Sequence, residues 1–310
     1  MNWESRYEKI RPLGAGYTSV AHLARARGGQ DVVVKTSTGN LESAHWARNQ
    51  QYENDILYSL RSLGDIGVDI PWGRLEMVDG EPYEVQQFLA GETLNDIYMS
   101  GRAIARQREA ARAIARFLAA LHSLPSPEGG YEEHPWHVLK KYMPKPGALA
   151  VLPREYQFAM SALGLELAGD DGIRAKRVLS HGDISGVNLI HNPDTGRLGV
   201  IDFGSSGMKT PYLDFSCLFR MTWPLKTESE AVVREYNSIM GSRGVSASKA
   251  ARYGVLRQFY FMFSEDGRGR AKDEAQLGRD VAQFIKYFDK YRTKWAQPCV
   301  RKELLPALTR

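Results

Sequence analysis

The sequence predicts an α+β fold with two unequal lobes, and three observations support this. Short apolar and β-branched runs dominate the first 90 residues and indicate a small antiparallel β-sheet. One segment among them, residues 43–63, repeats its apolar residues at helical spacing. After residue 90 the helical patterns become longer and more numerous. We therefore expect a sheet lobe with one helix over residues 1–90 and a mainly helical lobe over residues 91–310.

The first strands enclose a glycine-containing loop and lead to a strand that ends in lysine. The loop contains Gly14, Gly16 and Ser19, and the strand is Asp31–Lys35. Glycines let backbone N–H groups approach phosphate, and a lysine neutralises phosphate charge. The Ser19 hydroxyl adds a further donor. This combination predicts that Gly14, Gly16, Ser19 and Lys35 bind a nucleotide, whereas a G-x-G taken alone is more typical of a plain hairpin turn.

The second lobe is predicted to be built from helices. Apolar residues recur at helical spacing in five segments: 108–124, 154–167, 227–240, 246–263 and 273–295. Thr227 to Glu230 form a capping-box pattern that is expected to start the third of these helices, and Gly241 is expected to end it. The aromatic residues of the last two helices are expected to form the core of this lobe.

Residues 179–204 carry the strongest chemical signal. Asp183 follows His181-Gly182, Asn188 comes five residues later, and Asp202 lies 19 residues after Asp183. A turn at 192–196 between two apolar strands predicts a hairpin that brings Asn188 and Asp202 together. Mg²⁺ prefers oxygen ligands, and a carboxylate can accept the proton of an attacking hydroxyl. The segment therefore predicts phosphoryl transfer, with Asp183 as base and Asn188 and Asp202 as Mg²⁺ ligands. The alternative is an Asp- and Gly-rich surface turn.

This H-G-D-x-x-x-x-N pattern, with Gly182 where protein kinases have arginine, resembles the aminoglycoside phosphotransferase and choline kinase-like family. The resemblance extends from about residue 10 to residue 295 and implies a bilobal protein-kinase-like fold. It also implies that Glu53 pairs with Lys35. In the strand that leads to the second lobe, it implies that the backbone of Gln87 and Leu89 hydrogen-bonds the adenine.

The resemblance also assigns supporting residues. Pro211 to Phe215 is similar to the family's P-x-x-D-L motif, in which Asp214 would brace the catalytic loop. His122 ends a helix in an L-H-x-L pattern that is similar to one in the same family. We expect His122 and His181 to be hydrogen-bonded structural residues rather than reacting groups.

The implied activity is ATP-dependent phosphorylation of a small-molecule hydroxyl, with GTP left open as donor and with either an antibiotic or a metabolite as acceptor. Two other classes are considered. A protein kinase or effector kinase is disfavoured because nine residues separate Gly204 from Asp214, which leaves no room for an activation loop. A non-catalytic nucleotide-binding module is disfavoured because the chain retains every chemical residue of the pattern: Lys35, Asp183, Asn188 and Asp202.

Composition indicates where the protein acts. The two cysteines, Cys217 and Cys299, form no metal or disulfide pattern. The first residues have no signal-peptide character, and no apolar run approaches membrane-spanning length. We therefore expect a cytoplasmic protein without membrane association. No nucleic-acid-binding motif is present, so nucleic acid is not an expected partner.

Charge is distributed unevenly and bears on the acceptor. Residues 221–310 contain 17 basic and 10 acidic residues, a balance of +7, whereas residues 1–220 contain 24 and 26, a balance of −2. A basic lobe repels polycations, and this favours neutral or anionic ligands. We therefore expect a neutral or anionic hydroxyl acceptor. Four acidic residues could still gather at the cleft and reverse this preference: Glu132, Glu133, Asp170 and Asp171.

Overall fold

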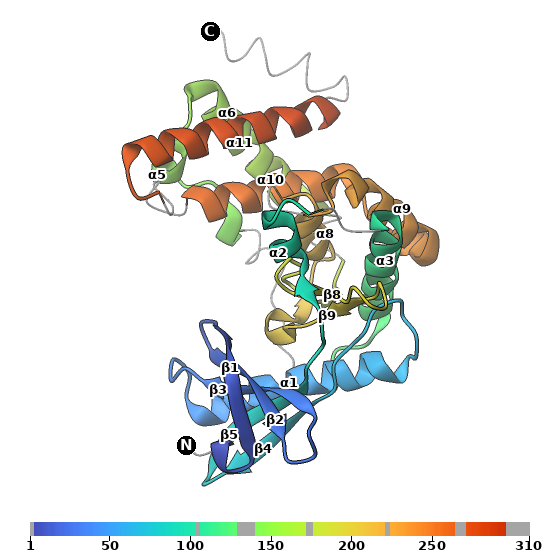
Figure 1. The fold of residues 1–310 in the computed structure, drawn as a ribbon. Coiled ribbons are helices and arrows are strands. Elements are labelled where there is room, and N and C mark those ends of the chain that lie inside the picture. The colour runs from blue at the N-terminus through green and yellow to red at the C-terminus, as the bar shows by residue number, and fades with distance from the viewer. Residues whose placement is uncertain are drawn as a thin grey trace.

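The computed structural model describes residues 3–102, 106–128, 140–171, 176–220, 224–263 and 271–295. The two expected lobes are present. Figure 1 shows the sheet and α1 in the lower part, the helices in the upper part, and β8 and β9 between them. The α+β class, with an antiparallel sheet lobe and a helical lobe, is confirmed.

The N-terminal lobe is a five-stranded antiparallel sheet in the order β1-β2-β3-β5-β4. A short turn, Trp3–Ser5, precedes it, and the strands are β1 (Tyr7–Ala15), β2 (Ser19–Ala26), β3 (Asp31–Ser37), β4 (Gly73–Val78) and β5 (Glu81–Gln87). One face buries Val32, Val34, Tyr83 and Val85 in a small core with Trp3. Because side chains alternate along a strand, Lys35 on β3 and its partner Glu84 on β5 lie on the other face.

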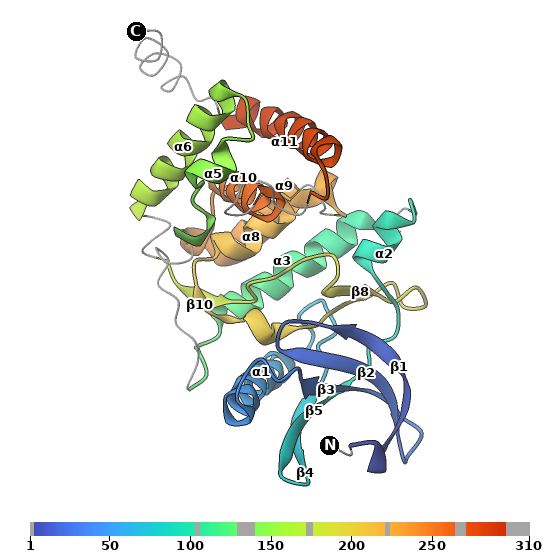
Figure 2. The same ribbon diagram turned by 90° about the vertical axis from the view of Figure 1, so that its left-hand side faces the viewer.

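Helix α1 (Ser43–Ser62) packs against β4 and β5 and also reaches the second lobe. Figure 2 shows it beside the sheet. Its residues Ile56, Leu57 and Leu60 are fully buried and belong to the hydrophobic core of the helical lobe. Glu53 on the same helix is also buried, although it is charged. Helix α1 is therefore shared by both lobes.

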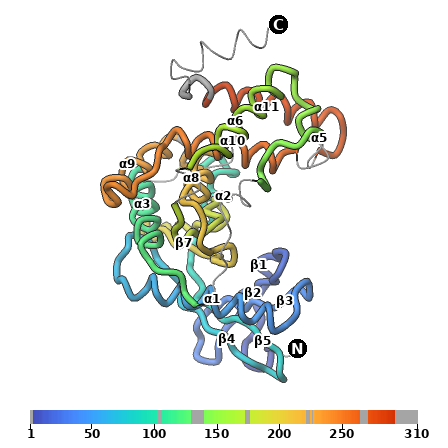
Figure 3. Tube along the Cα trace, turned by 180° about the vertical axis from the view of Figure 1, so that it is seen from behind, coloured from blue at the N-terminus to red at the C-terminus, as the bar shows by residue number. Residues whose placement is uncertain are grey.

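The second lobe is helical, as expected. Figures 1 and 3 show one group of helices next to the sheet lobe and a second group farther away, near the C-terminus. The first group contains α2 (Leu94–Met99), α3 (Gln107–Ser123), α8 (Tyr212–Leu218) and α9 (Ser229–Met240); the second contains α5 (Pro146–Leu149), α6 (Arg154–Gly169), α10 (Ala247–Phe263) and α11 (Glu274–Trp295). Most of the predicted aromatic core is buried, including Phe263, Phe284 and Phe288, while Tyr260 and Phe261 are only partly covered.

Short strands carry the predicted catalytic segment between the lobes. They are β6 (Glu92–Thr93), β7 (Val178–Ser180), β8 (Leu189–His191), β9 (Leu198–Val200) and β10 (Gly207–Lys209). Strands β8 and β9 form the predicted hairpin, with Leu189 opposite Val200. A tight turn, Phe203–Ser205, follows Asp202. The hairpin thus places the two predicted metal ligands at adjacent strand ends.

The connection after α1 docks on this hairpin. The Asp69 N–H donates to the Leu198 carbonyl at 2.7 Å, and the Val200 N–H donates to the Asp69 carbonyl at 3.0 Å. Arg197 forms ion pairs with Asp69 at 2.8 Å and with Asp65 at 3.1 Å. The sheet lobe is therefore linked to β9 by backbone and side-chain contacts, in addition to the covalent connection after β5.

The capping box predicted at Thr227 is wrong. Helix α9 begins at Ser229 after a turn at Lys226–Glu228, and Glu228 at the N-cap makes no side-chain capping bond. The Thr227 hydroxyl instead donates to Gln107 on α3, and the Ser229 hydroxyl donates to the Leu218 carbonyl on α8. Tertiary contacts thus use the two hydroxyls. Gly241 ends α9 as expected, with φ +55°.

Among the helices in the described ranges, none has the length and apolar character that a bilayer crossing requires. Cys217 is buried, while Cys299, Glu132 and Glu133 lie outside the described residues.

Candidate active site

The loop from His181 to Asn188 brings the predicted base and one predicted metal ligand into contact. The Asn188 side-chain amide donates to the Asp183 carbonyl at 2.9 Å and to the Asp183 carboxylate at 3.2 Å. The Ile201 N–H donates to the Asn188 carbonyl at 3.1 Å, which places the next residue, Asp202, beside the same loop. The three residues singled out for phosphoryl transfer therefore belong to one continuous structural unit.

Asp202 has an unusual backbone conformation, and its side chain accepts no hydrogen bond from the described residues. Its φ of 63° and ψ of 70° lie in the left-handed region, which non-glycine residues seldom adopt. Such conformations concentrate at functional sites, where the surrounding structure holds them. The side chain is exposed, and its carboxylate makes no hydrogen bond to the described part of the chain. Its oxygens remain available to a ligand.

A buried carboxylate, Asp214, supports the catalytic loop. Its Oδ1 accepts from the Gly182 N–H at 2.7 Å, and its Oδ2 accepts from the His181 N–H at 3.0 Å and contacts His122 Nε2 at 3.0 Å. The other nitrogen of His122 lies 2.9 Å from the Tyr236 hydroxyl. Burial would raise the pKa of Asp214, but the contacts from His122 and the loop amides hold it below its ordinary value. Asp214 thus fixes the loop in place.

His181 has a structural position, as expected. Its Nε2 lies 3.1 Å from the Ile201 carbonyl, and its Nδ1 accepts from the Asp183 N–H at 3.3 Å. The ring packs against Phe203, with centroids 4.6 Å apart. His181 therefore joins the loop before Asp183 to the strand before Asp202.

Gly182 is required by the backbone. Its φ is +83°, and a Cβ atom at this position would clash with the Ser205 carbonyl oxygen. Lys209 Nζ also lies close to that position and donates to the same carbonyl at 2.7 Å. A longer side chain, such as the arginine of protein kinases, does not fit this loop geometry.

Lys35 lies between two carboxylates. Its Nζ is 3.0 Å from Glu53 Oε1 and 3.2 Å from Glu84 Oε2. Burial alone would lower the pKa of Lys35, but the charges of Glu53, Glu84 and Asp202 raise it above its ordinary value. Lys35 therefore remains a cation. The Lys35–Glu53 pair is the one that the sequence pattern implies, whereas Glu84 was not anticipated.

Glu53 links the lysine to the catalytic segment. Its Oε1 also accepts from the Gln86 amide at 3.1 Å and from the Phe203 N–H at 3.1 Å. Residues Glu84 and Gln86 lie on one face of β5 at alternate positions. Two polar residues in an otherwise buried strand are unusual, and this could have marked them as site residues from the sequence. Only the strand register, which sets Glu84 opposite Lys35, shows what they contact.

The remaining nucleotide residues are less constrained. Gly14 and Gly16 have ordinary φ values, and space is open around their Cβ positions, so the fold alone does not require glycine there. The Ser19 hydroxyl accepts from the Trp46 indole at 3.0 Å and keeps its own proton for donation. The Gln87 N–H donates to the Trp72 carbonyl at 2.9 Å, which leaves the Gln87 carbonyl and the Leu89 backbone for a ligand.

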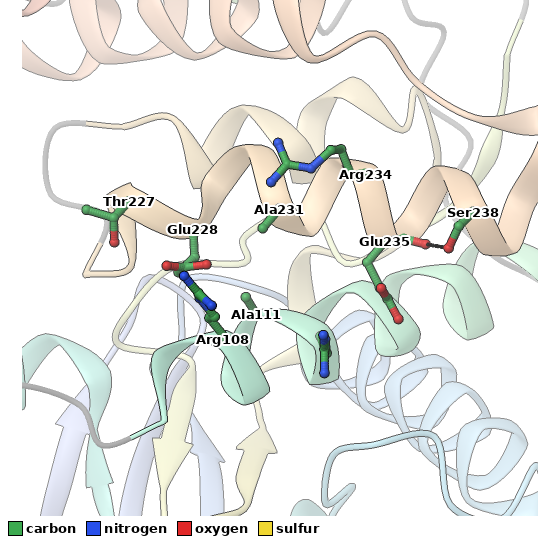
Figure 4. A pocket seen from close by; sticks show the side chains of 9 residues that line it. Arg108, Ala111, Thr227, Glu228, Ala231, Arg234, Glu235 and Ser238 are labelled. Atoms are coloured by element: carbon green, nitrogen blue, oxygen red, sulfur yellow. Dashed lines mark hydrogen bonds between the residues drawn. The ribbon is translucent and has the colours of Figure 1, made fainter.

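Of two surface pockets, one includes the predicted nucleotide residues Gln87 and Leu89 and the other includes none of the predicted site residues. One, of about 560 Å³, is lined by Gln87 to Ala90, the connection after α1 and the β8–β9 hairpin. The other, of about 460 Å³, lies between α3 and α9, where Figure 4 shows Arg108 beside Glu228 and Arg234 on the upper helix. Neither is lined by Asp183, Asn188 or Asp202. The residues argued to perform chemistry therefore occupy a separate position between the lobes.

Comparisons with known proteins agree with this geometry. The sequence profile of the phosphotransferase enzyme family matches residues 9–245. The chain belongs to this family. The class expected from the sequence, a small-molecule kinase, is confirmed at this level. No curated protein sequence matches the chain.

Solved structures show the same fold at low sequence identity. Wild-type aminoglycoside 2'-phosphotransferase-IIIa with GDP is 18% identical, with a TM-score of 0.63 and 93% of each chain covered. The streptomycin–ATP complex of APH(2″)-IIa is 19% identical, with a TM-score of 0.56, covering 90% of this chain and 92% of that one. The macrolide 2'-phosphotransferase MphH from Brachybacterium faecium is 17% identical, with a TM-score of 0.55, covering 93% and 90%.

The clash at Gly182 generates a test. We expect Gly182→Ala to lower kcat by at least about tenfold, because a side chain at a positive φ costs about 1 kcal/mol or more and displaces the loop that holds Asp183. Gly196→Ala is the matched control, since Gly196 has a φ of +69° with open space around it. The measurement is steady-state turnover together with thermal unfolding of both variants. Equal losses of kcat in the two variants would show that the Ser205 contact is unimportant.

Proposed function

We propose that the protein transfers the γ-phosphate of ATP to a hydroxyl group of a small molecule, with GTP open as an alternative donor. In this proposal residues 1–90 bind the nucleotide, and residues 91–310 supply the catalytic loop and the acceptor site. The observation that carries it is the junction of Asp183, Asn188 and Asp202 on one braced loop and hairpin. Family membership supports the reaction class.

Asp183 is the proposed base. Its carboxylate is half-buried and accepts one bond at 3.2 Å, from the Asn188 amide. The remaining lone pairs are free to take the proton of an acceptor hydroxyl as that oxygen attacks phosphorus. The loop amides held by Asp214 keep this carboxylate in a fixed place.

Asn188 and Asp202 are the proposed Mg²⁺ ligands. The side-chain nitrogen of Asn188 donates to Asp183, so the side-chain oxygen, Oδ1, is the atom left for a metal. The Asp202 carboxylate accepts no hydrogen bond within the described residues. Two hard oxygen donors of this kind would suit Mg²⁺, a cation that proteins usually hold with one or two such groups together with substrate phosphates. No group of three or more His, Cys, Asp or Glu side chains that could hold a metal ion occurs in the described ranges. Bound there, Mg²⁺ would neutralise charge that develops on the transferred phosphoryl group.

The nucleotide is assigned to the face of the sheet that carries Lys35. Lys35 would contact the α- and β-phosphates, and Gly14, Gly16 and Ser19 would lie along the phosphates. Open space around both glycines supports this role, because close approach of a ligand is then the physical reason for having no side chain. The Gln87 carbonyl and the Leu89 N–H would bind adenine.

Unpaired arginines support a neutral or anionic acceptor. Arg257, 2% exposed, donates to the Leu213 carbonyl and the Ser216 hydroxyl at 3.0 Å, and Arg220 stacks over Phe261 at 4.6 Å. Within the described residues neither arginine forms an ion pair with a carboxylate. Burial opposes the charge of Arg257, but Cys217, Tyr142 and Asp183 raise its pKa, so it stays cationic near the proposed base.

One of the four acidic residues that could reverse this charge preference, Asp170, is already paired within the protein. Asp170 forms an ion pair with Lys249 at 2.6 Å. Its charge is therefore balanced within the protein. A polycation near Arg220 and Arg257 would meet positive charge that no ion pair within the described residues offsets, which costs free energy.

Asp183→Asn tests the base. The amide cannot accept a proton, so we expect kcat to fall by at least about 10²-fold, the lower end for general base catalysis. The dissociation constant of ATP should change little, because Asp183 is not assigned to the nucleotide. The control is Asp194→Asn in the exposed β8–β9 turn. Turnover of Asp183→Asn close to that of the control would remove Asp183 from this role.

Asp202→Ala tests the metal site. Loss of a free oxygen ligand should abolish the Mg²⁺ dependence of ATP binding, measured by titration calorimetry with and without Mg²⁺. Circular dichroism should show an unchanged fold, because the Asp202 side chain makes no hydrogen bond in the described part of the chain. A normal response to Mg²⁺ in this variant would show that the assignment is wrong.

An acceptor panel tests substrate and class together. With γ-labelled ATP we expect label on neutral or anionic hydroxyl compounds in preference to kanamycin-type polycations, and none on a general protein substrate. A higher kcat/KM for the polycations that falls with added salt would contradict the charge argument. Label on protein would support a protein kinase, and ATP binding without any transfer would support a non-catalytic module.

A further inference from the structure

A second buried carboxylate shares Lys35 with Glu53. Glu84 lies directly opposite Lys35 across the β3–β5 pair, its Oε2 is 3.2 Å from Lys35 Nζ, and its exposed fraction is 0%. Glu53, on α1, lies 3.0 Å from the same nitrogen. One cation is thus flanked by two buried carboxylates, and Asp202 adds a third negative charge that Lys35 senses.

The two carboxylates differ in their hydrogen bonds. Glu53 Oε1 accepts from Lys35, from the Gln86 amide and from the Phe203 N–H. Apart from the ion-pair contact with Lys35, neither oxygen of Glu84 has a well-formed hydrogen bond among the described residues. Bonds donated to a carboxylate favour its ionised form, and two carboxylates at one site raise the pKa of at least one of them. The lack of donated bonds and the nearby carboxylate therefore favour the protonated form of Glu84.

Among the other neighbours of Glu84, the Gln86 side chain lowers the pKa of this carboxyl, but its effect is smaller than those of burial and of Glu53. Across the β4–β5 pair the partner of Glu84 is Leu75, which is apolar, and the charged groups that face Glu84 are Lys35 on β3 and Glu53 on α1. Burial and the charge of Glu53 raise the pKa of Glu84 to about 8, against the opposing effect of Lys35. At neutral pH the neutral acid is then the main form.

We propose that Glu84 is a positioning residue that holds Lys35 as a neutral acid in the nucleotide-bound state, so that above neutral pH it takes up a proton when nucleotide binds. The proposal rests on the nucleotide role proposed for Lys35. Before Mg²⁺ binds, Lys35 with ionised Glu53, Glu84 and Asp202 would form a cluster of net charge −2, which repels phosphate. Protonation of Glu84 removes one of these charges. The step is the addition of one solvent proton to one carboxylate, and no other bond changes.

The experiment is titration calorimetry of Mg²⁺–ADP binding to the intact protein at pH 7, 8 and 9. Each titration is run in two buffers of different ionisation enthalpy, so that proton uptake is measured directly. In the wild type we expect proton uptake at pH 8, and a Kd that rises roughly tenfold from pH 7 to pH 9, as for a group that titrates near 8 and binds in its protonated form. In Glu84→Gln the uptake should vanish and the Kd ratio should fall toward one.

Glu81→Gln is the matched control, because Glu81 is an exposed carboxylate on the same strand that contacts Ser43 rather than Lys35. It should keep the pH dependence of the wild type. A wild-type Kd that is constant from pH 7 to pH 9, or the same dependence in Glu84→Gln, would overturn the proposal. The proton count needs only the wild type, so it decides the matter even when Glu84→Gln does not fold. Absence of nucleotide binding at every pH would contradict the proposed function itself.

Discussion

The candidate site depends on one buried charge, the carboxylate of Glu53. An ionised group that is 1% exposed is stable only when it is paired and hydrogen-bonded. Its three partners come from β3, from β5 and from the backbone just after Asp202. Satisfying this one oxygen therefore fixes Lys35, the sheet and the catalytic hairpin relative to one another. Helix α1 can carry such a charge because Ile56, Leu57 and Leu60 anchor it in the core of the other lobe.

Asp214 performs the same physical task for the loop that Glu53 performs for the lysine. Each is a buried carboxylate that accepts hydrogen bonds from donors on separate elements, and each holds those elements in fixed positions. The groups that would do chemistry are held differently. Asp183 accepts a single side-chain bond and Asp202 accepts none among the described residues. The supporting carboxylates thus make most of the hydrogen bonds, while the oxygens proposed to react make few.

Sequence reasoning succeeded where the determinants are local. The helix of residues 43–63, the β8–β9 hairpin and the D-x-x-x-x-N loop each follow from a short pattern, and the structure contains all three. It failed where a distant partner decides. Thr227 was expected to cap its own helix but bonds to Gln107, 120 residues away. Glu84 belongs to no recognisable motif. Its contact with Lys35 depends on the strand register that sets the two residues opposite each other.

The stretch between Gly204 and Asp214 leaves little room for a mobile activation segment. The turn Phe203–Ser205 places the Ser205 carbonyl against Gly182, β10 pairs with β7, and α8 begins at Tyr212. Almost every residue here already has a structural task, so none is left for a mobile activation segment. On the facing loop, Gly182 has no room for a side chain because the Ser205 carbonyl oxygen packs against it. Contacts within the folded chain therefore position the loop that carries Asp183.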